Sequence, residues 1–451
     1  MLRLLRDTWP LMLGVLLLTL GNGMQGTLLG IRGAIEGFSA VEMSLVMTAY
    51  FLGFLVSTRI VPRLIARVGH VRVFAAFGSV ISAALLLYAA FPNLVAWIAL
   101  RVIVGAGFAA VYVVAESWLN DAVPNETRGQ ALSTYMMVQL LGVITAQGLL
   151  NLGDPAGWSL FVLISVAVSL SFAPILLSVS PAPMFAGQQT MPLGRLFHTS
   201  PLGFVGVLLL GAVYAAMFSM AAVYGAELGL GVAEITGFVA AIYLGGLMLQ
   251  YPVGWLSDRI DRRRLALGMA LGGAAAAVLG AALGAGSIWV MTAAGFLVGG
   301  VANPLYSLLI AHANDFLEPE DRASASGGLL FLFGVGSLFG PVAVGAGMAL
   351  SGPWAFFAFM AAVFLGIAGY AGWRVTRRAA PRPADTGGFS PIPPQATVVA
   401  VSAAVEAVAE AHADAIETAQ AEAEGEAVAA GAMDGTTEVS GEAAGQAPPR
   451  P

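Results

Sequence analysis

Two charged residues, Arg101 and Glu116, lie within one long apolar run and are the strongest candidates for chemistry in this sequence. A guanidinium can hold an anion and a carboxylate can carry a proton, but either group is costly in hydrocarbon unless it faces a wet cavity or a partner. Fifteen residues separate the two, about 22 Å along a helix, and fifteen steps of 100° bring them to within about 60° of one face. We therefore expect both to line one cavity without pairing directly.

Each of these residues also has a second interpretation. Arg101 lies near one end of its run, and its long side chain can instead extend to the outer membrane surface. Glu116 lies toward the other end, near Arg128. There it would either form a salt bridge that closes an inner gate or act as a proton carrier that couples transport. Both pairs of alternatives stay open at the level of sequence.

Uncharged polar side chains occur in several other apolar runs. Such groups either face a solute cavity or hydrogen-bond between neighbouring helices. We predict that a set of them lines the same cavity as Arg101. Its members are Asn22, Gln25, Tyr112, Gln139, Tyr214, Tyr243, Asn303 and Tyr306.

The residues that usually carry catalysis or hold metals are scarce. The chain has no cysteine and only four histidines, which lie far apart and lack neighbouring ligand types. Disulfides, thiolate sites and metal centres are therefore not expected. No spaced nucleophile or phosphate-binding loop appears, so we expect neither an enzyme nor a cofactor. A nucleic-acid partner is not expected either.

The composition is that of an integral membrane protein. Of the 451 residues, 58% are hydrophobic and only 10% are charged, whereas a soluble domain carries about 25% charged residues. A bilayer span needs about 20 apolar residues, and twelve runs of that kind can be counted. We predict an all-α fold of twelve transmembrane helices.

The arginines predict the orientation of these helices. All of the basic residues are arginines, and with both termini inside nearly all of them fall on the inner side. The outer loops keep only Arg32, and Arg101 lies within a span. This asymmetry follows the positive-inside rule. We expect a multi-pass protein of a bacterial inner membrane with both termini in the cytoplasm.

The second half of the chain repeats the first. Gly53 recurs as Gly245 after 192 residues, and Gly105 recurs as Gly299 after 194 residues. Because each half has six spans, the two halves enter the membrane in the same direction as a parallel pseudo-repeat. The predicted domains are an N-terminal bundle at 1–178, a central cytoplasmic loop at 179–200, a C-terminal bundle at 201–378 and a tail at 379–451.

The tail differs in composition from the rest of the chain. It holds eleven of the 26 acidic residues but only two arginines, and it is rich in Ala, Glu and Pro. It has too few bulky apolar residues to fold alone. We predict a disordered acidic tail, solvated or with a regulatory or docking role.

Charged residues crowd into the stretch 254–263, which reads Gly-Trp-Leu-Ser-Asp-Arg-Ile-Asp-Arg-Arg between two apolar runs. It resembles the short loop Gly-x-Leu-Ala-Asp-Arg-x-Gly-Arg-Lys of the major facilitator superfamily (MFS) of secondary transporters. Asp261 departs from the family glycine. In the first half, Ala66 replaces the family aspartate and Pro62 the glycine. The stretches around Tyr112–Glu116, Arg128 and Tyr135 are similar to the YcaD-type branch.

The resemblance covers residues 1 to about 378 and implies roles for several residues. In the family this loop holds the two bundles together on the cytoplasmic side, helix one lines the cavity, and an arginine in helix four is linked to coupling. It implies a coupling role for Arg101 and a gate that is stronger in the second half. Glu116 is the second coupling candidate by its position alone, and a plain charge anchor is the alternative for the loop. The gate members are Gly254, Asp258, Arg259, Arg262, Arg67, Arg128 and Arg322.

The resemblance therefore implies a secondary active transporter that works by alternating access. Its expected partners are a small organic solute, protons and the lipid bilayer, and we expect a monomer. Export and uptake both stay open. The alternative function is that of a non-transporting membrane sensor or scaffold that signals through its acidic tail.

Overall fold

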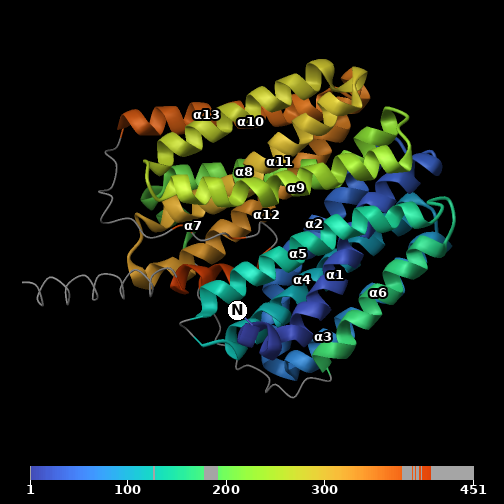
Figure 1. Cartoon of the computed structure of the whole chain (residues 1–451), viewed down its shortest axis with the longest axis horizontal. Coiled ribbons are helices and arrows are strands. Elements are labelled where there is room, and N and C mark those ends of the chain that lie inside the picture. Colours follow the sequence, from blue (N-terminus) through green and yellow to red (C-terminus); the bar gives the residue numbers. More distant parts are fainter. Residues whose placement is uncertain are drawn as a thin grey trace, which may run out of the picture.

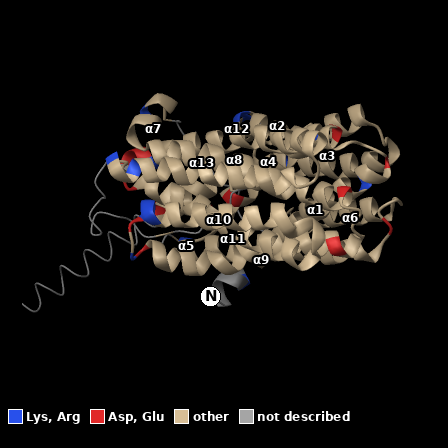
Figure 2. Ribbon diagram, turned by 90° about the horizontal axis from the view of Figure 1, so that it is seen from above, with Lys and Arg blue, Asp and Glu red and all other residues tan. Residues whose placement is uncertain are grey.

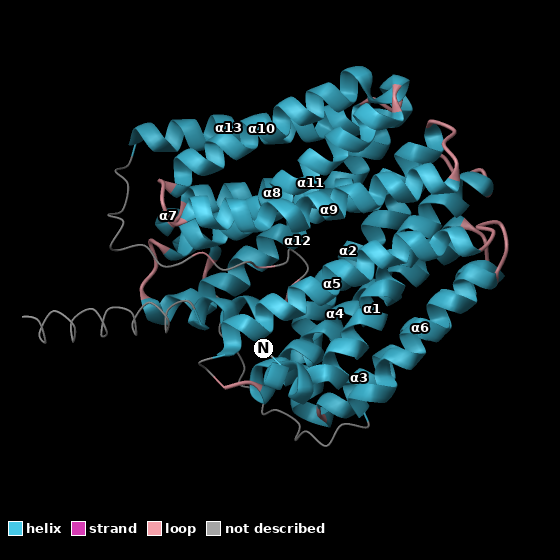
Figure 3. Ribbon diagram, in the orientation of Figure 1, coloured by secondary structure: helices cyan, strands magenta, loops and turns pink. Residues whose placement is uncertain are grey.

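Two six-helix bundles lie side by side in the computed structural model (Figure 1). It describes residues 2–124, 127–176, 191–377, 389, 392, 396, 397 and 399–407. Every regular element in these ranges is a helix (Figure 3). The first bundle contains α1 (Leu2–Ile35), α2 (Ala40–Val68), α3 (His70–Ala90), α4 (Leu94–Ala122), α5 (Arg128–Leu149), the short η2 (Leu150–Leu152) and α6 (Ser159–Leu176).

The second bundle repeats this arrangement after a short connecting helix, α7 (Leu193–Thr199). Part of the predicted central loop is therefore helical, with Leu196 fully buried, while residues 177–190 lie outside the described ranges. The bundle contains α8 (Pro201–Glu227), α9 (Val232–Ser257), α10 (Arg262–Leu283), η3 (Gly284–Gly286), α11 (Ile288–Asn314), α12 (Pro319–Ser351) and α13 (Ala355–Arg377).

The described chain has twelve helices that are long and apolar enough to cross a membrane. Their membrane-length segments run from 18 to 32 residues, which matches the hydrocarbon thickness at about 1.5 Å per residue. The predicted twelve-span, all-α fold is confirmed. A capping box begins α2, since Ser39 and Glu42 satisfy each other's backbone N–H groups.

Glycines allow the helices of each bundle to cross closely, and they do so at equivalent positions. A Cβ added at Gly53 in α2 would lie 2.0 Å from the Val102 carbonyl oxygen in α4. In the other half, a Cβ at Gly245 in α9 would lie 1.9 Å from the Phe296 oxygen in α11. Neither crossing admits a side chain. The repeat read from the sequence thus corresponds to the same helix crossing in both bundles.

The two ends of the bundles differ in charge and in how the bundles meet. Arginines gather at the end that carries α7 and the start of α10, called here the arginine-rich end (Figure 2). At the opposite end the bundles touch directly: the Asn151 amide donates to the Thr236 hydroxyl at 3.0 Å, and Gly345 of α12 packs against Ser44 of α2. At the arginine-rich end, residues of the tail lie between the bundles (Figure 1).

Candidate functional site

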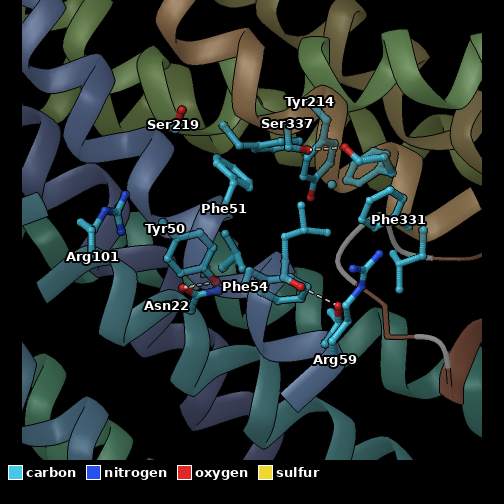
Figure 4. Close-up of a pocket in the computed structure, with 18 of the residues that line it drawn as sticks. Asn22, Tyr50, Phe51, Phe54, Arg59, Arg101, Tyr214, Ser219, Phe331 and Ser337 are labelled. Carbon is cyan, nitrogen blue, oxygen red and sulfur yellow. Dashed lines mark hydrogen bonds between the residues drawn. The ribbon is translucent and has the colours of Figure 1, made fainter. Parts of the chain in front are cut away.

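A cavity of about 250 Å³ lies between the two bundles. Helices α1, α2, α4 and α5 contribute residues from one side, and α8, α9 and α12 from the other. Aromatic and polar side chains from both bundles line it (Figure 4). The wall residues used in the following argument are Asn22, Gln25, Tyr50, Phe51, Phe54, Arg59, Arg101, Tyr214, Phe218, Ser219, Tyr243, Phe331 and Ser337.

A polar network runs across the first bundle at the edge of this cavity. The Asn22 amide nitrogen donates to the Tyr112 hydroxyl at 3.1 Å, and its oxygen accepts from the Gln25 amide at 3.1 Å. The Tyr50 hydroxyl also donates to the Asn22 oxygen at 3.4 Å. These bonds join α1, α2 and α4 and hold the Asn22 and Gln25 side chains toward the cavity.

Arg101 joins the same network. Its Nη1 donates to Gln25 Oε1 at 2.7 Å, and its guanidinium carbon lies 5.1 Å from the centre of the Tyr50 ring. Its Nη2 points at Met47 Sδ at 2.7 Å, and its buried Nε has no hydrogen-bond partner. The residue is only 3% exposed. It faces the cavity (Figure 4), so it does not extend to the membrane surface in this conformation.

The other predicted cavity residues fall into two groups. Tyr214 and Tyr243 line the main cavity. Gln139 and Asn303 line a smaller cavity of about 30 Å³, which Tyr214 and Tyr243 also border. Tyr112 and Tyr306 are fully buried and border neither cavity. Tyr112 forms the interhelical hydrogen bond to Asn22, which accounts for a polar group at its position. Tyr306 packs edge-on against Phe333.

Sequence reasoning missed several wall residues. Tyr50, Phe51 and Phe54 lie on one stretch of α2, and Arg59 lies one to two turns beyond them. Their spacing follows the helical period. Aromatic residues in an apolar run, however, look the same whether they face lipid, a neighbouring helix or a cavity. Among these four residues only Arg59 is charged, and the sequence placed it with the arginines of the inner side.

Glu116 is buried away from the main cavity. Its carboxylate accepts a hydrogen bond from the Tyr135 hydroxyl at 3.0 Å and another from the Thr397 backbone N–H at 2.9 Å. The Thr397 hydroxyl donates to it as well. No ion pair of Glu116 occurs among the described residues. In this conformation the carboxylate holds a tail residue, and the salt bridge considered for it is not formed.

The loop between α9 and α10 is organised around a buried ion pair. Arg262 Nη1 contacts Asp315 Oδ1 at 2.6 Å, and their side chains are only 5% and 4% exposed. Arg262 also lies 3.7 Å from the more exposed Asp258. Arg259 donates to the Trp255 carbonyl and lies over its ring. All of these contacts stay within the second bundle.

Several of the predicted gate residues contact described residues of the tail in this conformation. Asp258 accepts a hydrogen bond from the Phe389 backbone N–H at 2.9 Å, and Gly254 packs against the Phe389 ring. Arg128 pairs with Glu406 at 3.5 Å. Arg67 is exposed. The structure thus places tail residues where a contact between the bundles was expected.

The first-half counterparts of the buried pair are His70 and Asp121, which lie 192 and 194 residues before Arg262 and Asp315. His70 is buried, but Asp121 is exposed, whereas the Asp315 side chain is only 4% exposed. The carboxylate of the first half is therefore the more solvated of the two. Arg322 of the second half has a buried Nε without a hydrogen-bond partner.

Within the described ranges, no three residues with metal-binding side chains come together. The wall of the main cavity offers amide, hydroxyl, guanidinium and aromatic groups. Such a wall can bind a small organic molecule but contains no nucleophile paired with a base.

Known structures have the same arrangement of helices. The nucleoside transporter NupG superposes with a TM-score of 0.68 over 82% of this chain and 100% of its own, at 13% identity. A bacterial homologue of the human lysosomal transporter Spinster, in an inward-facing and unoccupied conformation, gives a TM-score of 0.62 over 88% and 97%, at 15% identity. At these identities the likeness concerns the fold alone.

Sequence comparison defines the family. An MFS-type transporter of Enterobacter sp. (strain 638) is 28% identical over 344 residues, 74% of this chain and 87% of its own. The MFS-type transporter YcaD of Escherichia coli (strain K12) is 27% identical over 342 residues, with the same coverage. The family model of the Major Facilitator Superfamily matches residues 11–249 and 202–409. The two overlapping matches span both bundles, and the chain belongs to the Major Facilitator Superfamily.

Proposed function

We propose that this MFS transporter moves a small organic solute through the cavity between its bundles by alternating access. The observation that carries the proposal is the position of that cavity. It is walled by both bundles, and the bundles touch directly at the opposite end through α5 and α9 and through α2 and α12. Rocking of one bundle against the other would therefore expose the cavity to each side in turn.

The arginine-rich end is the cytoplasmic end in this proposal. The positive-inside rule supports it, because the short loops at that end carry the arginines while the opposite loops carry only Arg32. Both termini then lie in the cytoplasm of a bacterial cell, and the protein lies in the inner membrane. The cavity is open toward the cytoplasmic side of α2 and α12, where Arg59 and Phe331 line it.

Transport is coupled to protons in this proposal, with Arg101 and Glu116 as the coupling residues. Glu116 is 1% exposed, and neutralisation of a buried carboxylate changes its hydrogen-bond capacity without requiring a counterion. Its partners Tyr135 and Thr397 belong to different parts of the structure. A proton on Glu116 would therefore alter a contact that joins the bundle to the tail.

The test is transport by the purified full chain in proteoliposomes. A library of labelled small organic solutes is screened by exchange across the membrane, and each hit is tested with an imposed pH gradient. Glu116→Gln should keep solute exchange but lose its response to the gradient. If no solute exchanges, the transport function is wrong. If the Gln variant keeps the full pH response, only the coupling role of Glu116 is wrong.

A further inference from the structure

The wall of the main cavity carries positive charge without a compensating acid. Arg101 and Arg59 both line it, and no aspartate or glutamate of the described residues does. Arg101 is nearly fully buried, and its hydrogen-bond partner at the cavity is the neutral Gln25. No carboxylate pairs with it among the described residues. A buried cation without a counter-charge is strongly unfavourable.

Arg101 also keeps unused hydrogen-bond capacity. Its buried Nε has no acceptor, and its Nη2 faces only the thioether of Met47, which is a weak acceptor. A guanidinium presents its donors in a fixed planar fork that suits the two oxygens of a carboxylate or a phosphate. The amide network of Asn22 and Gln25 holds this fork in place beside the cavity.

The remainder of the wall fits an aromatic or apolar body. Tyr50, Phe51 and Phe54 line the first-bundle side, and Tyr214 lies on the side of the second bundle (Figure 4). Phe218 of α8 also lines the cavity. The volume of about 250 Å³ lies below the range of about 300–1,000 Å³ typical of ligand pockets. It therefore suits a molecule of one ring with a short acidic side chain.

From these observations we propose that the transported solute is a small aromatic organic anion, with its acidic group on Arg101 and its ring among the aromatic side chains. This inference rests on the proposed transport function. Arg59 lies over the Phe331 ring at 4.7 Å at the other end of the cavity (Figure 4). It is exposed and provides a second positive charge that attracts the anion toward the cavity.

The test compares acids with matched neutral and cationic molecules on the purified full chain. Benzoate, phenylacetate and phenyl phosphate are measured against benzamide, phenylacetamide and benzylamine, by the shift in melting temperature and by exchange in proteoliposomes. We expect the acids to stabilise and to exchange. Arg101→Gln should weaken acid binding by about tenfold or more, since a charge-assisted hydrogen bond is lost. Arg101→Lys should keep the preference for acids but bind them less tightly.

The melting temperature without ligand shows whether each variant is folded. Because the buried charge is unpaired, Arg101→Gln should melt no lower than the wild type without ligand. Transport of the amides or of benzylamine at least as well as the acids would overturn the anion proposal and leave the transport function intact. Failure of every acid to stabilise the wild type also overturns it, whereas absence of exchange for all classes of solute argues against transport itself.

A separate observation concerns the tail. The Ile392 backbone N–H donates to the Ser307 hydroxyl at 3.0 Å, and that hydroxyl donates back to the Ile392 carbonyl at 3.1 Å. These two hydrogen bonds and the contact of Phe389 with Asp258 hold Phe389 and Ile392 of the tail against α9 and α11 of the second bundle. Ile392 is 3% exposed and forms part of the wall of the smaller cavity, beside Asn303.

The following described part of the tail contacts the first bundle. Thr397 is held by Glu116 of α4, and residues 399–407 form a helix whose Val401 and Val405 side chains are buried. Glu406 pairs with Arg128 at the start of α5. Described residues of a tail predicted to be disordered are thus packed between the bundles. Val401 and Val405 belong to the same buried apolar cluster as the transmembrane helices.

We infer that the described tail residues, 389, 392, 396, 397 and 399–407, act as an autoinhibitory plug. It binds both bundles at the arginine-rich end and fills the space beside the predicted solute residues Gln139 and Asn303. Closure of the bundles at that end, which alternating access requires, brings α4 and α5 toward α9 and α11 and leaves no room for it. The plug must therefore leave before the transporter completes its cycle.

The test uses the absence of native cysteine. An Ile392→Cys, Asn303→Cys pair should form a disulfide under mild oxidation, and transport should stop until the disulfide is reduced. The control is a second double variant at the opposite end, Asn151→Cys with Thr236→Cys. Its disulfide should form whether or not the tail is present. Failure of the first pair to form would overturn the packed position of the tail in the native protein.

Release of the plug provides a second measurement that does not depend on transport. Truncation after Arg377 should let the bundles close at the arginine-rich end. Labelling of a Ser337→Cys probe, which is 1% exposed in the intact protein, should then fall from that end and rise from the opposite end. Ile392→Asp in the full chain should act in the same direction, because it buries a charge. Glu406→Gln, on an exposed pair, should change little. Equal labelling of the intact and truncated proteins would overturn the plug.

Discussion

The buried ion pair between Arg262 and Asp315 should determine much of the stability of the second bundle. We consider Asp315→Asn, which keeps the size of the side chain but removes its charge. The side chains are 5% and 4% exposed, and their nearest atoms are 2.6 Å apart. Removal of one partner of such a pair leaves an uncompensated buried charge and costs about 3–5 kcal/mol.

A second carboxylate offsets part of that loss. Asp258 lies 3.7 Å from Arg262, but its side chain is 44% exposed, so its contribution is below about 1 kcal/mol. We therefore expect Asp315→Asn to destabilise the protein by about 3 kcal/mol, at the lower end of the range for a broken buried pair. This corresponds to a change of about two orders of magnitude in the unfolding equilibrium constant.

The pseudo-repeat supplies the control. Asp121→Asn makes the same change at the equivalent position of the first bundle, where the carboxylate is exposed, and should cost less than about 1 kcal/mol. Unfolding is followed by tryptophan fluorescence during titration of mixed micelles with a denaturing detergent. A double variant with Arg262→Gln should recover part of the stability, because no charge stays unpaired. Equal losses for Asp315→Asn and Asp121→Asn would refute the reasoning.

Three further predictions concern packing, gating and topology. Gly245→Val should prevent folding, because its Cβ would lie 1.9 Å from a carbonyl oxygen. Loss of the monodisperse peak in size-exclusion chromatography would show this. The control, Gly237→Val on the same helix, meets no atom within 4 Å and should fold. Asp258→Asn should weaken the outward-open state and raise labelling of a Ser337→Cys probe from the cytoplasmic side; unchanged labelling would leave the loop as a charge anchor. Reporter fusions after residue 188 and after Ser351 should report cytoplasm and periplasm, and a shared location would contradict the proposed topology.

The fold could be predicted almost completely from the sequence. Apolar runs of span length have few stable solutions in a bilayer, since every backbone group must be bonded internally. The repeat at Gly53 and Gly245 predicted equivalent helix crossings because only glycine lets two backbones approach so closely. The loop around Asp258 carried the resemblance to the family, which the family comparison confirmed.

The candidate site could be predicted only in part. Asn22, Gln25 and Arg101 are polar groups in an apolar setting, and such groups must find a partner or a cavity. Tyr50, Phe51 and Phe54 carry no such signal, because an aromatic side chain is equally stable against lipid, a helix or a solute. Tyr112 and Tyr306 carry the same polar signal, yet both are buried and border neither of the two cavities described above.

The sequence by itself therefore determined the number of spans, the repeat, the charged loop and the few polar positions within the membrane. These follow from the free-energy cost of placing a charge or an unpaired backbone group in hydrocarbon. That cost depends on the residue type and not on the rest of the fold. The tertiary structure decided which of those polar groups share a cavity, and that Arg101 meets no acid there among the residues the structure describes. It also decided that Ile392 and Thr397 of the tail are packed between the bundles. Such contacts depend on the relative position of segments more than 80 residues apart, and local sequence does not determine that position.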